Sequence, residues 1–199
     1  MHGLINRSIQ CFTRDTYGDQ VWEQAVERAQ TGHAGFEAML TYDDDITYQF
    51  LDALAAVLNR SRQEVMEDIG TYLVSHEKVG AVRRLLRFSG VTFADFLHSL
   101  DELHDRVRMA VPDLHIPQLS LREHASGQFS LRCHWDHPDF GYVVMGLLRG
   151  MADDYGALVF MDHQGTQGAD ELISIEVVEA DFAEGRSFML GNEEEALHG

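Results

Sequence analysis

The stretch FADFLHSLDELHDRVRMAV, residues 93–111, decides how the middle of this chain folds. Its apolar residues recur every three or four positions, which is the spacing of one face of an α-helix. Thr92 stands directly before the stretch and is a suitable N-terminal cap. The spacing therefore predicts one long helix from Phe93 to Val111, with an apolar stripe of Phe93, Phe96, Leu97, Leu100, Leu103, Val107 and Val111.

One of the eleven histidines of the chain, His104, falls within this apolar stripe. A histidine that faces an interior needs a partner, because an unsatisfied buried nitrogen costs about 1–3 kcal/mol. One interpretation is a core histidine bonded to a carbonyl or carboxylate group, and the other is a ligand of a metal ion or haem iron. The remaining histidines lack such a setting, and we expect His98, His163 and His198 to be exposed or incidental.

The sequence before this stretch is predicted to be helical, and the sequence after it contains strands. Ser61 and Glu64 form a capping box at the start of one helix. Helices are expected at Met1–Tyr17, Gln20–Ala29, Ile46–Asn59, Ser61 to about His76 and Val79–Phe88, with a loop at Thr31–Tyr42. After Pro112 we expect a hairpin around Ser126–Gly127, a helix at Phe140–Tyr155, and strands at Ala157–Met161 and Leu172–Val178 joined by a turn.

These elements predict an α+β fold in one domain of 199 residues. Residues 1–111 form the mainly helical part, residues 112–180 hold the hairpin, a helix and a small antiparallel sheet, and residues 181–199 form an acidic tail. The net charge of −18, from 15 Lys+Arg and 33 Asp+Glu, argues against binding to nucleic acid or to an anionic membrane surface. We expect a cytoplasmic protein, because neither a signal sequence nor a membrane span is evident and only two cysteines occur.

Two polar groups on the hairpin are candidates for chemistry. Alternation places Gln128, Ser130 and Arg132 on one face of the second strand, where they form either a carboxylate-binding row or an ordinary solvent face. Cys133, His134 and His137 follow closely and form either a zinc or redox site or a polar turn. A metal-dependent enzyme is the least favoured function, because neither a nucleophile–base pair nor a glycine-rich phosphate loop is present.

Three parts of the sequence resemble the H-NOX (haem nitric oxide/oxygen binding) domain, and the resemblance covers nearly the whole chain. They are the opening MHGLINRSI…YGDQVWEQ, the block FADFLHSLDELHDRVRMAVPDL followed by HIPQL, and the S-x-R motif of the hairpin. The length is similar to that of a stand-alone bacterial member. The resemblance implies a helical distal lobe and a proximal lobe of helices and sheet, with a ferrous haem b (iron protoporphyrin IX) between them.

The resemblance also implies roles for particular residues. His104 is the axial ligand of the iron, and Pro117 distorts the porphyrin. Ser130 and Arg132 match the last two residues of the family's Tyr-x-Ser-x-Arg propionate motif, in which Gln128 replaces the tyrosine. Val143 takes the position of a tyrosine found in members that hold oxygen, and the rest of the distal pocket is lined by Ile5, Ile9, Leu73 and Leu147.

An apolar pocket gives bound oxygen no charge-assisted hydrogen bond, whereas nitric oxide needs none. We therefore expect a sensor without enzymatic turnover that binds nitric oxide and CO and excludes oxygen. The family resemblance suggests a separate signalling partner, either a histidine kinase or a diguanylate cyclase/phosphodiesterase. The alternative function is a redox- or zinc-responsive regulator that uses Cys133, His134 and His137.

Overall fold

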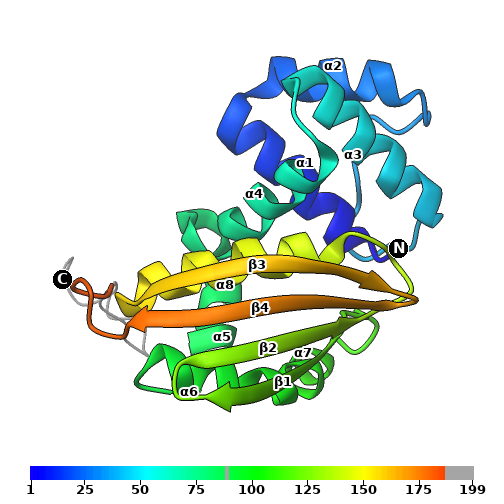
Figure 1. Ribbon diagram of the computed structural model, residues 1–199. Coiled ribbons are helices and arrows are strands. Elements are labelled where there is room, and N and C mark those ends of the chain that lie inside the picture. Colours follow the sequence, from blue (N-terminus) through cyan, green and yellow to red (C-terminus); the bar gives the residue numbers. More distant parts are fainter. Residues whose placement is uncertain (88–89, 187–199) are drawn as a thin grey trace, which may run out of the picture.

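The computed structural model describes residues 1–87 and 90–186, in which a helical lobe stands above a sheet backed by helices (Figure 1). The helices of the first half begin and end close to their predicted bounds. They are α1 (Gly3–Tyr17), α2 (Asp19–Ala29), α3 (Asp44–Leu58), α4 (Arg62–Ser75) and α5 (Gly80–Arg87), with the 3₁₀ turn η1 (Glu77–Val79) before α5. Phe88, the predicted end of the last of these helices, lies outside the described residues.

Two helix starts are held by reciprocal side-chain caps. The Ser61 hydroxyl accepts a hydrogen bond from the Glu64 N–H at 3.2 Å, and the Glu64 carboxylate accepts one from the Ser61 N–H at 2.8 Å. Thr92 and Asp95 repeat the arrangement at 3.1 and 3.0 Å. The predicted caps at Ser61 and Thr92 are therefore confirmed, and each satisfies backbone donors that a helix leaves free at its first turn.

The predicted long helix from Phe93 to Val111 is wrong in one respect, because it is interrupted. It consists of α6 (Phe93–His98), the 3₁₀ turn η2 (Ser99–Glu102) and α7 (Leu103–Ala110). The Arg106 guanidinium donates to the Ser99 carbonyl at 2.6 Å, and the Leu103 N–H bonds to the Leu100 carbonyl instead. The tighter turn nevertheless keeps the apolar stripe on one side, and its members from Phe93 to Val107 are all buried.

The sheet is antiparallel, in the order β1-β2-β4-β3. Its strands are β1 (Gln118–Ala125), β2 (Gln128–His134), β3 (Leu158–Gln167) and β4 (Asp170–Glu179), and α8 (Phe140–Tyr155) precedes β3 as predicted. The last two strands are longer than expected. Residues 163–167, assigned to a turn from sequence, belong to β3 because they pair with the start of β4. Residues 187–199, which include His198 and most of the expected tail, lie outside the described residues.

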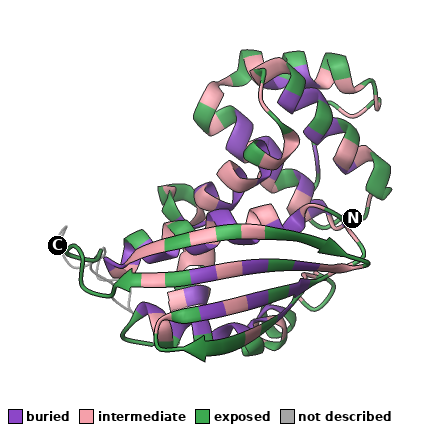
Figure 2. Cartoon of the chain, viewed as in Figure 1, coloured by how far each residue is buried: buried purple, intermediate pink, exposed green. Residues whose placement is uncertain are grey.

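The two faces of the sheet differ in what covers them. Helices α5–α8 lie behind the sheet in Figure 1, and no described helix lies in front of it. We call the helix-covered side the inner face and the other the outer face. Buried residues alternate with exposed ones along the strands (Figure 2), and the inner face contributes Leu119, Phe129, Leu131, Cys133, Ile173 and Ile175 to one core with α6, α7 and α8. No described helix is long and apolar enough to cross a membrane.

Helices α4 and α8 join the helical lobe to the sheet layer through direct backbone contact. A Cβ atom added at Gly70 would overlap the Val143 carbonyl oxygen, and one added at Gly146 would overlap the Glu67 carbonyl oxygen. Glycine at these two positions therefore lets the helices approach more closely than any other residue allows. The Thr71 hydroxyl donates to the Gly146 carbonyl at 3.1 Å across the same crossing.

Candidate functional site

His104 lies in the first turn of α7, on the side that packs into the core. Its neighbours Leu103 and Val107 are buried, and the His104 ring itself is half-buried. The Nδ1 atom of His104 is buried and has no hydrogen-bond partner among the described residues. The carbonyl or carboxylate expected of an ordinary core histidine is therefore missing at this atom, which leaves a nitrogen for a group from outside the chain.

The predicted distal residues lie on helices of both lobes. Ile9 is buried in the core shared by α1, α3 and α4, and Ile5, Leu73 and Val143 pack against the same core. Leu147, one turn after Val143 on α8, packs against the core of the sheet layer instead. The structure therefore brings four of these five apolar residues to one cluster, and α8 connects that cluster to the fifth.

The hairpin row forms as alternation predicted, but it occupies the outer face. Gln128 is exposed, the Arg132 side chain is 58% exposed, and Ser130 is half-buried. The Ser130 hydroxyl is 2.8 Å from His124 Nε2, and Arg132 lies 3.8 Å from the Asp170 carboxylate. The structure thus matches the interpretation of this row as a solvent face and separates it from the helices that carry His104.

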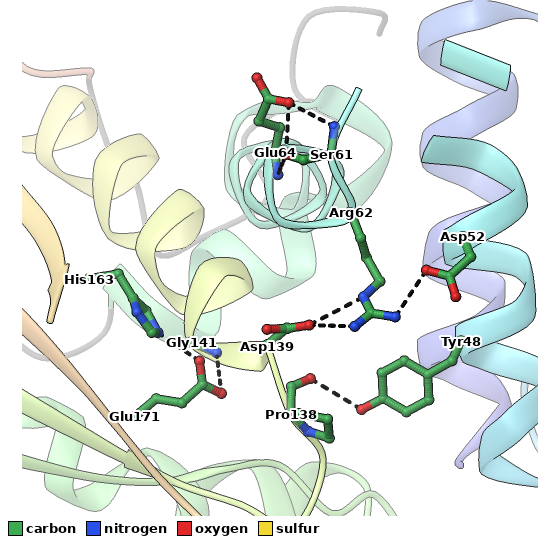
Figure 3. A network of polar contacts seen from close by, with 10 residues as sticks. All are labelled: Tyr48, Asp52, Ser61, Arg62, Glu64, Pro138, Asp139, Gly141, His163 and Glu171. Atoms are coloured by element: carbon green, nitrogen blue, oxygen red, sulfur yellow. Dashed lines mark hydrogen bonds and ion pairs between the residues drawn. The ribbon is translucent and has the colours of Figure 1, made fainter. Parts of the chain in front are cut away.

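A network of polar contacts, which we call the polar junction, joins α3 and α4 to the start of α8 (Figure 3). Arg62 of α4 donates to the Asp139 carboxylate at 2.7 and 3.2 Å and to Asp52 of α3 at 2.9 Å. The Tyr48 hydroxyl donates to the Pro138 carbonyl at 3.2 Å. These contacts fix the segment before α8 against the helical lobe.

The second half of the polar junction is buried and joins α8 to the sheet (Figure 3). The Glu171 carboxylate of β4 accepts the Gly141 N–H at 3.1 Å and lies 2.8 Å from Nε2 of His163 on β3. The Gly165 N–H donates to His163 Nδ1 at 3.2 Å, so Nε2 carries the proton that is donated to Glu171. Sequence reasoning treated His163 as incidental, and this was wrong. The available signal was Glu171, a carboxylate in phase with the inward-facing Ile173 and Ile175.

Tyr142, which directly precedes Val143, is held by the same residues. Its ring stacks on the His163 imidazole with centroids 4.4 Å apart and planes 9° from parallel. Burial raises the pKa of its hydroxyl. The stacking holds the Tyr142 ring against β3, and Tyr142 also borders the apolar core of α1, α3 and α4.

Comparison with known proteins assigns the chain to a family. The model of the haem-NO-binding family (HNOB) matches residues 2–163. This chain belongs to that family. It is 27% identical to soluble guanylate cyclase gcy-34 of Caenorhabditis elegans over 156 residues, which are 76% of this chain and 23% of the relative. It is 26% identical to soluble guanylate cyclase 89Db of Drosophila melanogaster over 121 residues, 61% of this chain and 18% of the relative. The chain thus spans about a fifth of the length of these relatives.

Solved H-NOX proteins share the fold of this family member. The unliganded Fe(II) H-NOX protein from K. algicida matches with a TM-score of 0.76 and 15% identity, covering 95% of this chain and all of that one. The S. oneidensis H-NOX protein in the Fe(II)NO state matches with a TM-score of 0.70 and 19% identity, covering 89% of this chain and 99% of that one. The predicted α+β fold, a helical lobe with a small antiparallel sheet layer, is therefore confirmed.

The haem that this family binds can be tested against the residues present. His104 is compatible with an axial ligand, because its buried Nδ1 has no protein partner among the described residues and a neutral imidazole can bind iron. The clustered apolar residues Ile5, Ile9, Leu73 and Val143 fit the hydrocarbon of a porphyrin. Pro117 is half-buried directly before β1. The predicted propionate row does not fit, because Gln128, Ser130 and Arg132 face away from the core that contains the α7 stripe.

The Cys133–His137 segment does not form a zinc or redox site. Cys133 points to the inner face, His134 bonds to Asp170 on the outer face at 2.6 Å, and His137 lies near Asp44 at 3.9 Å. No group of three metal-ligating side chains occurs among the described residues. Burial and the nearby carboxylates of Glu171 and Asp170 raise the pKa of Cys133 to about 12, so the thiol is protonated and unreactive at neutral pH. The alternative function that relied on this segment is therefore not favoured.

Proposed function

We propose that this domain is a haem-based sensor that binds nitric oxide and CO and excludes oxygen. The observation that carries the proposal is the buried, unpartnered Nδ1 of His104 within the apolar stripe of a haem-NO-binding family member. A bound haem b would supply a ferrous iron that binds the gas. His104 would hold this iron, and the half-buried Pro117 would press on the porphyrin.

The choice of gas follows from the residues proposed to line the distal side. Ile5, Ile9, Leu73, Val143 and Leu147 offer no hydrogen-bond donor from their side chains. Stable binding of oxygen would need such a donor, whereas binding of nitric oxide or CO would not need one. The nearest hydroxyl along α8 belongs to Tyr142, whose ring is stacked on His163. These features support exclusion of oxygen.

The proposed output is conformational, without enzymatic turnover, and acts on a separate cytoplasmic partner. Helix α8 carries Val143 toward the helical lobe, while the Gly141 N–H in its first turn is bound by Glu171 of the sheet. A gas that favours one position of α8 would shift the population of the whole domain toward that position. A histidine kinase or a diguanylate cyclase/phosphodiesterase is the partner class that we propose from the family resemblance.

An anaerobic absorption spectrum of the reduced, haem-supplied protein tests this function. We expect a Soret band that shifts on addition of nitric oxide or CO and does not shift when air is admitted. A protein that takes up no haem would contradict the proposal as a whole, and a lasting shift in air would contradict the oxygen exclusion alone.

A pair of variants at one position sharpens the second point. Val143→Tyr supplies a hydroxyl to the distal side, and we expect the spectrum to shift in air. Val143→Phe has similar bulk without the hydroxyl and serves as the control, for which we expect no such shift. Equal behaviour of the two variants would show that Val143 does not face the gas.

A further inference from the structure

We infer that Ser130 and Arg132 do not bind the propionates of the haem and instead belong to the external surface of the domain, an inference that rests on the proposed function for its haem-binding part. The S-x-R spacing matches the family motif, but the strand presents these side chains on the outer face of the sheet, away from the core that contains α6, α7 and α8. The observation that carries the inference is the burial pattern of β2, in which every second side chain from Phe129 to Cys133 is buried and the side chains between them are not.

The buried row of β2 fixes which way the strand faces. Phe129, Leu131 and Cys133 are 4%, 0% and 1% exposed and belong to the core that contains α6, α7 and α8. Because side chains alternate along a strand, Gln128, Ser130 and Arg132 must point to the other side. The inner side of β2 therefore carries two hydrocarbon side chains and a thiol, and none of these can neutralise a carboxylate.

Both neighbouring strands agree with this orientation. Leu131 of β2 pairs with Leu121 of β1 and with Ile173 of β4, and Phe129 pairs with Ile175. A slip by one residue would move the whole apolar set of β2 to solvent and would bury Gln128, Ser130 and Arg132 in its place. The orientation of the row is thus determined by three strands together.

The outer-face row already has partners of its own. Ser130 contacts His124 of β1 at 2.8 Å, and Arg132 shares the Asp170 carboxylate with His134. Beside the row is a hollow lined by polar residues, such as His124 and Ser174, and by apolar residues that include Phe160, which is 66% exposed. These contacts cross the outer face from β1 to β4, and none of them involves a residue of the helices.

Thiol accessibility tests the orientation without any haem. In a background of Cys11→Ser and Cys133→Ser, we would compare Arg132→Cys with its matched neighbour Leu131→Cys by the rate of maleimide labelling. We expect Arg132→Cys to react about a hundredfold faster, because residue 131 becomes accessible only when the protein opens. Equal rates once urea is added serve as the control. Protection of residue 132 together with rapid labelling of residue 131 would overturn the inference.

Haem retention tests the assignment itself. The double variant Ser130→Ala/Arg132→Ala should lose haem to apomyoglobin within about twofold of the wild-type rate, with an unchanged circular dichroism melt of the apoprotein. Loss that is about tenfold faster with the same melt would overturn the inference. If the wild-type protein takes up no haem, the proposed function fails, while the labelling rates still decide which way the row faces.

Discussion

His104 and His163 present two opposite situations for a histidine in this domain. His163 lies between β4 and α8, where its Nε2 is bonded to Glu171 and its Nδ1 accepts the Gly165 N–H. His104 lies in α7, and its buried Nδ1 has no partner among the described residues. The difference teaches that burial alone does not mark a ligand, because a satisfied imidazole supports the fold and an unsatisfied one is available for chemistry.

The largest expected effect is that of His104→Gly, which removes the available nitrogen. We expect the Soret band to disappear and to return when free imidazole is added, because imidazole can occupy the space left by the side chain. His98→Gly, on the exposed side of α6, is the matched control and should keep its haem. Retention of haem by His104→Gly would show that the unpartnered nitrogen is not the ligand.

Glu171→Ala tests the opposite member of the comparison, since it leaves both His163 Nε2 and the Gly141 N–H without a partner. Breaking a buried pair of this kind should lower the free energy of unfolding by about 3 kcal/mol. For a chain of this size the corresponding drop in Tm is about 6–12 °C. Glu176→Ala, on the exposed side of the same strand, should change the free energy of unfolding by less than about 0.5 kcal/mol.

Asp15, in the helical lobe, is a carboxylate that has hydrogen-bond partners, as His163 has in the sheet layer. Hydrogen bonds from Lys78 and then from Tyr72 hold the pKa of Asp15 below its usual value. A lowered pKa in the folded state means that the stabilisation is present above the unfolded pKa and is lost as the pH falls through the folded one. The free energy of unfolding measured in urea should therefore fall more between about pH 5 and pH 3 for the wild-type protein than for Asp15→Asn. This is about the pH range in which carboxyl groups titrate. Equal pH dependence of the two proteins would contradict this account.

Tyr142→Phe is expected to have the smallest effect, because the ring keeps its stacking on His163 and only a hydroxyl is removed. The free energy of unfolding should change by less than about 0.5 kcal/mol, and the spectrum in air should be that of the wild-type protein. Any difference in air between the spectra of Tyr142→Phe and the wild-type protein would place the Tyr142 hydroxyl on the distal side. The surroundings of His163 would then not be separate from the gas-binding side.

Local patterns were sufficient to predict much of the fold and to place His104 on the core side of its helix. The capping residues Ser61 and Thr92 and the apolar stripe of residues 93–107 were readable because they depend on neighbours within one or two turns. The helix break at Ser99–Glu102 could not be predicted from sequence, because the Arg106 guanidinium binds the Ser99 carbonyl only in the folded chain.

The inward phase of Glu171 could be predicted from sequence, but its contact with His163 could not, since the two residues meet only after β3 turns back to pair with β4. The orientation of the hairpin row, by contrast, was present in the alternation of Phe129 and Leu131. The S-x-R spacing matches the family's propionate motif, whereas the same alternation also predicts an ordinary solvent face for Gln128, Ser130 and Arg132.

The glycine crossing of α4 and α8 has a consequence for the order in which the chain matures during synthesis. Thr71 and Gly146, which bond across it, are 75 residues apart in sequence. At about 5–20 residues per second, a ribosome needs about 4–15 s to deliver the second helix after the first. The cluster of Trp22, Phe36 and Phe50 comes entirely from earlier residues and can assemble in that interval. Helix α4 must wait with its glycine face uncovered until α8 has been synthesised, so the joint between the two lobes closes only after the helical lobe is complete.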